Sequence, residues 1–165
     1  MLSSRSATSH PRLAGLRRLV GHSWGNKVLL LDALWRLIGL RAFLLIYGTQ
    51  RQPRLYGRAS KPEIGTAVNA AITLTAEQED LARRVGWAIR RVEALLPFDV
   101  VCLPQALVGR RMLRNRGIAS VMFFGVERNK PMAEVGTHAW LVAGPAKVTG
   151  FPQRARYNVF ASYVP

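Results

Sequence analysis

The chain has 165 residues, of which 49% are hydrophobic and 20% charged, and its formal net charge is +15. That length supports one domain with its own core, and the composition excludes an intrinsically disordered chain. The single cysteine, Cys102, excludes an internal disulfide and any metal site that needs two thiolates from one chain. We expect no metal and no cofactor. We also expect a cytoplasmic protein, because a lone cysteine suits a reducing compartment.

Arginine dominates the basic charge, since only four of the 24 basic residues are lysines. Ten basic residues precede position 61, five lie between 61 and 96, and nine follow. A nucleic-acid binder usually concentrates such charge on one element and adds stacking aromatic residues. The spread along the chain therefore favours no nucleic-acid partner, and a basic module for nucleic acid or for an anionic membrane stays an alternative.

Residues 1–62 are predicted to form a basic arm, a helix and a linker ahead of the main domain. Residues 1–26 lack the continuous apolar run of a secretory signal. Val28 to Tyr47 has the length of a membrane span, but it carries three charges that oppose insertion into a bilayer. We therefore expect an amphipathic helix, and peripheral contact with a membrane surface stays an alternative for it. Two prolines and two glycines make Gly48 to Pro62 the predicted linker.

Residues 63–165 are predicted to form the main domain. Thr75 and Gln78 have the spacing of a capping box, so a helix is expected to begin at Thr75, and Pro97 is expected to end it. A second helix is expected from about Cys102 to Arg116.

Two residues outside that second helix are expected to cap it. Gly117 suits the C-terminal cap, and Asp99 suits the N-terminal cap. Four segments rich in β-branched and aromatic residues then follow at short intervals, which predicts antiparallel strands. They are Ile118 to Val126, Thr137 to Ala143, Lys147 to Thr149 and Tyr157 to Tyr163. The expected fold class is α+β, with N-terminal helices ahead of a core in which the Cys102 helix packs on a small antiparallel sheet.

Two residues in this region suit nucleophilic chemistry. Cys102 stands at a helix N-terminus, where backbone N–H groups and the helix dipole stabilise a thiolate. Ala106 and Gly109 continue its face as small residues that allow a strand to approach, and Arg110, with Arg111 and Arg114, is expected to face the other way. His138 lies inside an apolar strand, where its ring needs a partner.

Each residue also has a structural interpretation. Cys102 can be a small buried hydrophobe, and His138 can be a core histidine held by a backbone carbonyl. A cysteine at a helix start followed by a histidine on a later strand is, however, the order of papain-like thiol enzymes.

Four motifs in order resemble the leader peptidases of lasso peptide biosynthesis, which are similar to transglutaminase-like cysteine proteases. The motifs are PFDVVCLPQAL from Pro97, LRNRGI from Leu113, FGV from Phe124 and THAWL from Thr137. The resemblance implies a cysteine protease that removes the leader from a ribosomally made precursor peptide, so that a separate ATP-dependent cyclase can close the ring. It also implies a small pocket near Cys102 that reads a threonine just before the last leader residue.

The resemblance assigns Cys102 as the nucleophile and His138 as the general base. The family's aspartate, twelve residues after the histidine, falls here on Gly150, and no acidic residue follows His138. Thr149, Asn158 or a backbone oxygen are the substitutes that we consider for orienting the imidazole.

The resemblance further implies a leader-recognition domain, which is fused to the protease in some family members and separate in others. Because residues 1–60 lack an alternating strand pattern, the chain resembles the form that works with a separate leader-recognition protein. The apolar face of Val28 to Tyr47 can dock that partner, or the helix can cap the protease core. A catalytically silent adaptor of the same fold, which only presents the precursor, stays an alternative because the carboxylate is missing.

Overall fold

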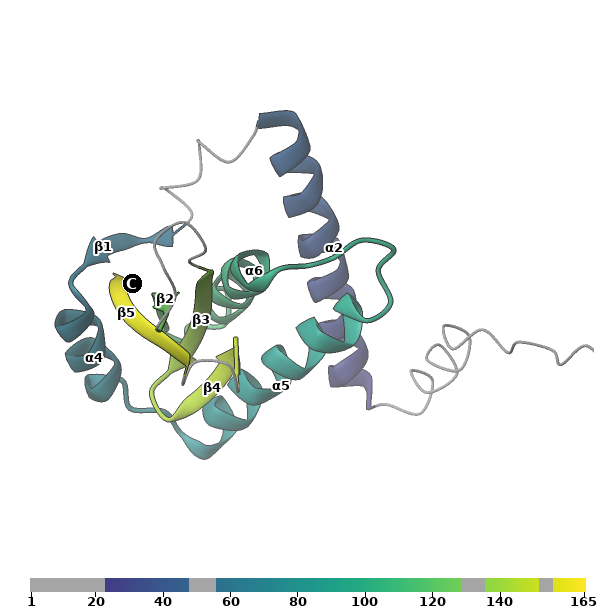
Figure 1. Cartoon of the computed structure of the whole chain (residues 1–165). Coiled ribbons are helices and arrows are strands. Elements are labelled where there is room, and N and C mark those ends of the chain that lie inside the picture. The colour runs from purple at the N-terminus through teal and green to yellow at the C-terminus, as the bar shows by residue number, and fades with distance from the viewer. Residues whose placement is uncertain (1–22, 48–55, 129–135, 152–155) are drawn as a thin grey trace, which may run out of the picture.

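The computed structural model describes residues 23–47, 56–128, 136–151 and 156–165 of the chain (Figure 1). Its helices are α2 (Trp24–Tyr47), α4 (Pro62–Ala71), α5 (Ala76–Glu93) and α6 (Cys102–Arg114). Its strands are β1 (Arg58–Ser60), β2 (Val121–Glu127), β3 (Thr137–Ala143), β4 (Ala146–Thr149) and β5 (Tyr157–Val164). These elements confirm the α+β fold class.

The strands form one sheet in the order β1-β5-β2-β3-β4, and every neighbouring pair is antiparallel. Helix α4 packs on β5 and β2 from one face, whereas α5 and α6 pack on β3 and β4 from the other (Figure 1). Helix α2 lies outside α5 and α6. The helix that begins at the cysteine is therefore held between the sheet and α2.

Helix α5 begins as the sequence predicts. Thr75 is its N-cap, its side chain accepts a hydrogen bond from the backbone N–H of Gln78, and the Gln78 side chain accepts one from the Thr75 N–H. The helix ends at Glu93, four residues before Pro97, so the proline follows the end instead of causing it.

Helix α6 ends in the predicted glycine cap but does not begin in the predicted aspartate cap. Gly117 has φ +69°, and the N–H of Ile118 donates to the carbonyl of Leu113, which is the pattern of a Schellman motif. The prediction for Asp99 is wrong, because the helix begins at Cys102 and its N-cap is therefore Val101.

Of the three arginines on α6, Arg110 differs from the prediction, whereas Arg111 and Arg114 are exposed. Arg110 does not face the solvent: it is 8% exposed, and its guanidinium donates to the carbonyls of Tyr163 at 2.9 Å and Val164 at 2.7 Å. Burial, and then the neighbouring charge of Arg114, lower the pKa of Arg110. The residue fastens α6 to the last strand.

The predicted linker contains an edge strand. Its residues 48–55 lie outside the described part of the chain, but Arg58–Ser60 pairs with β5. The Ser162 hydroxyl donates to the Lys61 carbonyl at 2.7 Å, and the Ser60 carbonyl lies 3.1 Å from the same oxygen. Helix α4, which follows directly, was not predicted. The linker prediction is wrong here because the partners of this segment lie about a hundred residues away in the sequence.

Helix α2 begins four residues before the predicted start and caps the core. The residues that it buries against α5 and α6 are Leu29, Leu30, Ala33 and Leu37. Asp32 accepts hydrogen bonds from Arg36 in the same helix and from Arg116 beyond α6. Among the described helices, none is long and apolar enough to cross a membrane. The division of the chain at residue 62 stays a prediction, and residues 1–22 of the basic arm lie outside the described part.

The capping box of α5 gives a stability prediction. Thr75→Ala removes the acceptor for the Gln78 N–H and should lower the free energy of unfolding by about 1 kcal/mol. Urea unfolding followed by circular dichroism measures the change. Thr73→Ala, at an exposed position just before the cap, is the matched control and should change little. Equal losses in both variants would contradict a capping role for Thr75.

Candidate active site

Cys102 is the first residue of α6 and is partly exposed. The N-cap residue Val101 has no side chain that can accept a hydrogen bond from the first turn, and Pro104 has no N–H. The N–H groups of Cys102 and Leu103 have no intrahelical partners, as at any helix start. The sulfur therefore lies beside backbone donors and the positive end of the helix dipole.

Small residues bring α6 close to β3. Ala106 and Gly109 are buried, and a Cβ on Gly109 would come within 2.9 Å of the Leu141 side chain. This close approach confirms the predicted role of the small residues. It also allows the N–H of Ala139 to donate a hydrogen bond to Cys102 Sγ at 3.4 Å.

His138 directly precedes the residue that contacts the thiol. Its ring is 7% exposed, stacks on Tyr157 with ring centroids 4.8 Å apart, and lies 6.1 Å from the Trp140 ring. Its Nε2 atom lies 2.9 Å from the carbonyl oxygen of Gly150. A carbonyl only accepts hydrogen bonds, so Nε2 carries the proton and the neutral ring keeps its free lone pair on Nδ1.

The structure thus brings the two candidate residues to the same point of the molecule, where the start of α6 meets the start of β3. The contact to the sulfur comes from the backbone next to His138, whereas the hydrogen bond of the imidazole goes to Gly150.

Gly150 stands where the sequence resemblance predicts an aspartate, and it supplies a backbone carbonyl to His138 instead. Its φ is +83°, and a Cβ there would lie 2.5 Å from the Trp140 Cβ and 2.7 Å from the Ala139 carbonyl. Only glycine permits this approach. Of the other substitutes considered, Thr149 is buried and its hydroxyl has no hydrogen-bond partner among the described residues, and Asn158 is exposed on β5.

A hollow of about 370 Å³ lies beside the start of α6. Val101 and Pro104, which flank Cys102, form part of its wall, and Arg41 lies over the Phe98 ring at 5.5 Å. The remaining lining residues are Leu37, Leu44, Asp99 and Val100. Such a pocket can hold a small, mostly apolar side chain. In the described part of the chain, no group of histidine, cysteine and acidic side chains is arranged to hold a metal ion.

A family model described as the transglutaminase-like superfamily matches residues 28–162. The chain belongs to this superfamily. Its members include cysteine proteases and transglutaminases. The matched region includes α2 from residue 28 onward, so most of this helix is part of the family fold. No curated protein and no solved structure matches the chain.

Gly150 offers a test of how the imidazole is oriented. Gly150→Ala adds a Cβ at a position that Trp140 already fills, and should displace the Gly150 carbonyl. Because that carbonyl is the hydrogen-bond partner of His138 Nε2, the ¹⁵N NMR signals of the His138 ring should change. Gly117→Ala is the matched control, because it has a similar positive φ but open space around the added Cβ. The control should lose about 1 kcal/mol of stability from backbone strain, and Gly150→Ala about 1 to 3 kcal/mol more from overpacking. An unchanged His138 spectrum in Gly150→Ala would contradict the assigned hydrogen bond.

Glu93, the last residue of α5, gives a pH-dependent prediction. Burial raises its pKa, opposed by a hydrogen bond with Gln105 and by the charge of Arg90. The folded chain therefore holds this proton more tightly than the unfolded chain, and stability falls as pH rises from the ordinary glutamate pKa of about 4.3 through the raised value. Glu93→Gln should raise stability at pH 7 relative to wild type, and this gain should vanish below about pH 4.

Glu77→Gln is the control of opposite sign. A hydrogen bond with Thr75 lowers the Glu77 pKa, so its charged form favours folding and the variant should lose stability at pH 7. Urea unfolding of both variants at the two pH values measures the effects. A gain for Glu93→Gln that is the same at both pH values would show that burial of the charge is not its cause.

Proposed function

We propose that the protein is a cysteine protease that removes the leader from a ribosomally made lasso peptide precursor. The observation that carries the proposal is the position of Cys102, at an uncapped helix start and in contact with the backbone next to His138. The order of the four sequence motifs supports the peptide class, and membership of the superfamily supports the chemistry.

In this mechanism His138 takes the thiol proton on Nδ1, and the Cys102 sulfur attacks the carbonyl carbon of the last leader residue. The backbone N–H groups at the start of α6 stabilise the oxyanion, and the N–H of Ala139 stabilises the thiolate before attack. The protonated imidazole then gives its proton to the departing amine as the C–N bond breaks. Water hydrolyses the thioester and restores the thiol.

Gly150 replaces the family's carboxylate in this scheme. Its carbonyl can fix the Nε2-protonated tautomer, but as a neutral group it stabilises the imidazolium less than a carboxylate does. The hollow beside Val101 is the proposed site for the side chain before the last leader residue. The proposed partners are the precursor peptide, a separate leader-recognition protein and the cyclase, and the proposed location is the cytoplasm.

A second candidate is a silent adaptor of the same fold that binds the leader without cutting it. The specific observation in its favour is the environment of His138, which is buried, stacked on aromatic rings and satisfied by a carbonyl. That environment also fits a structural histidine.

Cleavage of the precursor tests the proposal directly. Incubation of the purified chain with the precursor should release the leader, and Cys102→Ala should reduce the rate at least a thousandfold while its circular dichroism spectrum is unchanged. Cleavage by Cys102→Ala would disprove the proposed nucleophile. Leader binding that survives in both Cys102→Ala and His138→Ala, without cleavage by wild type, would establish the adaptor.

Alkylation by iodoacetamide tests the pairing of the two residues without any substrate. The chain has one cysteine, so mass spectrometry reports modification of Cys102 alone. If His138 activates the thiol, wild type should react faster than His138→Ala at pH 6, where a free cysteine is almost fully protonated. Equal rates would contradict a general-base role for His138.

A further inference from the structure

The outer face of α2 carries an apolar stripe that no described residue covers. Its members recur at intervals of four and three residues along the whole helix, and the most exposed are Trp24, Trp35 and Leu45, at 79%, 74% and 71%. The full stripe is Trp24, Val28, Leu31, Trp35, Ile38, Ala42 and Leu45. Apolar residues on such a seven-residue repeat form the seam of a helix–helix contact. An exposed apolar patch of this extent on a folded domain marks a surface that binds another protein, a membrane or a ligand.

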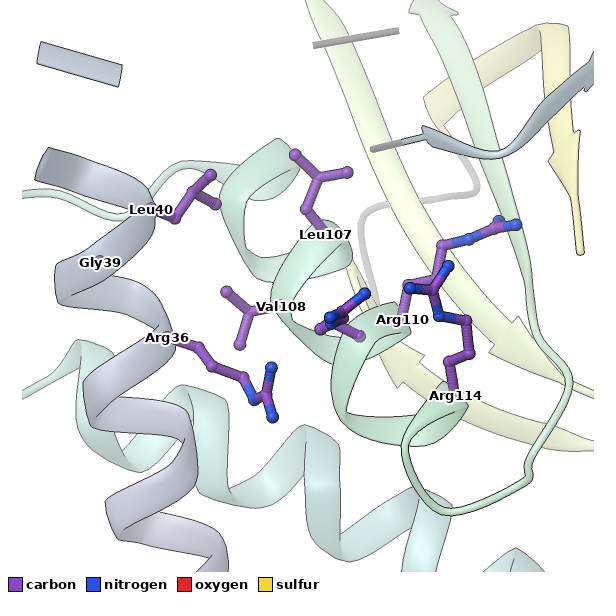
Figure 2. A pocket seen from close by; sticks show the side chains of 8 residues that line it. Arg36, Gly39, Leu40, Leu107, Val108, Arg110 and Arg114 are labelled. Atoms are coloured by element: carbon purple, nitrogen blue, oxygen red, sulfur yellow. The ribbon is translucent and has the colours of Figure 1, made fainter. Parts of the chain in front are cut away.

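Cations lie on both sides of this stripe. Helical spacing places Lys27 and Arg41 along one edge, and the ion pair of Asp32 and Arg36 near the other. Beyond Arg36, a cavity of about 420 Å³ opens between α2 and α6 (Figure 2). It is lined by Arg36, Gly39 and Leu40 from α2 and by Leu107, Val108, Arg110, Arg111 and Arg114 from α6.

The arginines of this cavity differ in whether they are already paired. Arg36 is bound to Asp32, and Arg110 is bound to carbonyls of the last strand. Arg111 and Arg114 are exposed and form no ion pair with any residue that the structure describes. Figure 2 shows the Arg114 side chain beside that of Arg110 at the cavity. The cavity therefore combines an apolar wall with unpaired positive charge.

We propose that the stripe and the cavity together dock an acidic amphipathic helix of a partner protein. The apolar face of that helix would lie along the α2 stripe, and a carboxylate from its edge would enter the cavity between Arg111 and Arg114. Arginine binds carboxylates with two parallel hydrogen bonds, which fixes the register of such a contact. This proposal goes beyond the proposed function and does not rest on Cys102.

Three other occupants of the stripe are a second copy of the chain, its own residues 1–22 and a membrane, and the first two are disfavoured by charge. A second copy of the chain would bring two molecules of net charge +15 together along a stripe that has Lys27 and Arg41 on one edge. Residues 1–22 contain four arginines and no acidic residue, so that edge repels them as well. An anionic membrane surface could neutralise the cations around the stripe. It offers no helix that matches the seven-residue spacing of the stripe, however, and no side chain that could enter the cavity.

A designed peptide tests the proposal with the full-length protein. The probe is a synthetic three-heptad helix with Leu at its seam positions and Glu at the flanking positions, and the comparison peptide has Lys in place of Glu. Fluorescence anisotropy of the labelled peptides measures binding. We expect the Glu peptide to bind with an affinity that falls as salt is raised, and the Lys peptide to bind at least about tenfold more weakly.

Two variants and two controls locate the site. Trp35→Glu should weaken binding of the Glu peptide by about thirtyfold or more, and Arg114→Glu by about fivefold at low salt. Ile64→Glu, at an exposed apolar position on α4, and Arg58→Glu, at an exposed position on β1, should change it less than about twofold. Leu31→Gln and Arg111→Glu replace the first pair if either variant unfolds.

Four results would overturn the proposal. They are no binding of the Glu peptide, equal binding of the two peptides, losses in the controls that match those in the variants, and occupation of the stripe by something else. If a second copy of the chain covered the stripe, sedimentation equilibrium would show a dimer that Trp35→Glu dissociates. If a membrane covered it, the protein would bind vesicles of phosphatidylglycerol and phosphatidylcholine, and this binding would exclude the Glu peptide. Failure of precursor cleavage would leave these binding results unchanged, so the two proposals are tested separately.

Discussion

The close approach of α6 to β3 is the constraint on which the candidate site depends. Gly109 and Ala106 remove the side-chain bulk between helix and sheet, and the backbone of Ala139 then reaches the sulfur of Cys102. A larger residue at position 109 would collide with Leu141 and push the helix away. The geometry of the thiol is therefore set by packing a full two turns away from it, and the chemistry at the helix start depends on the core behind it.

Arginine holds the same helix at its other end. The Arg110 guanidinium donates hydrogen bonds to two carbonyls of the last strand, and Arg116, just beyond the end of α6, donates one to Asp32 of α2. Part of the large positive charge is thus structural, because a guanidinium can satisfy several backbone or carboxylate acceptors at once. Arg111 and Arg114 form no ion pair with any described residue, and they line the cavity between α6 and α2.

Gly150 gives the imidazole a different electrostatic environment from the aspartate that the sequence resemblance predicts. Where a carboxylate would both orient the imidazole and neutralise its charge, a carbonyl on a glycine with positive φ does only the first. The same hydrogen bond would hold a structural histidine in place. The difference in thiol reactivity between wild type and His138→Ala is consequently the property that distinguishes a protease from a catalytically inactive adaptor.

The sequence by itself determined the features that short stretches of chain decide. It predicted the α+β class, the capping box at Thr75, the glycine cap at Gly117 and the antiparallel strands, since each follows from local hydrogen bonds and side-chain periodicity. It also singled out Cys102 and His138. Only the tertiary structure decided that 58–60 is a strand and that Gly150 holds the imidazole, because each of these depends on a partner distant in sequence.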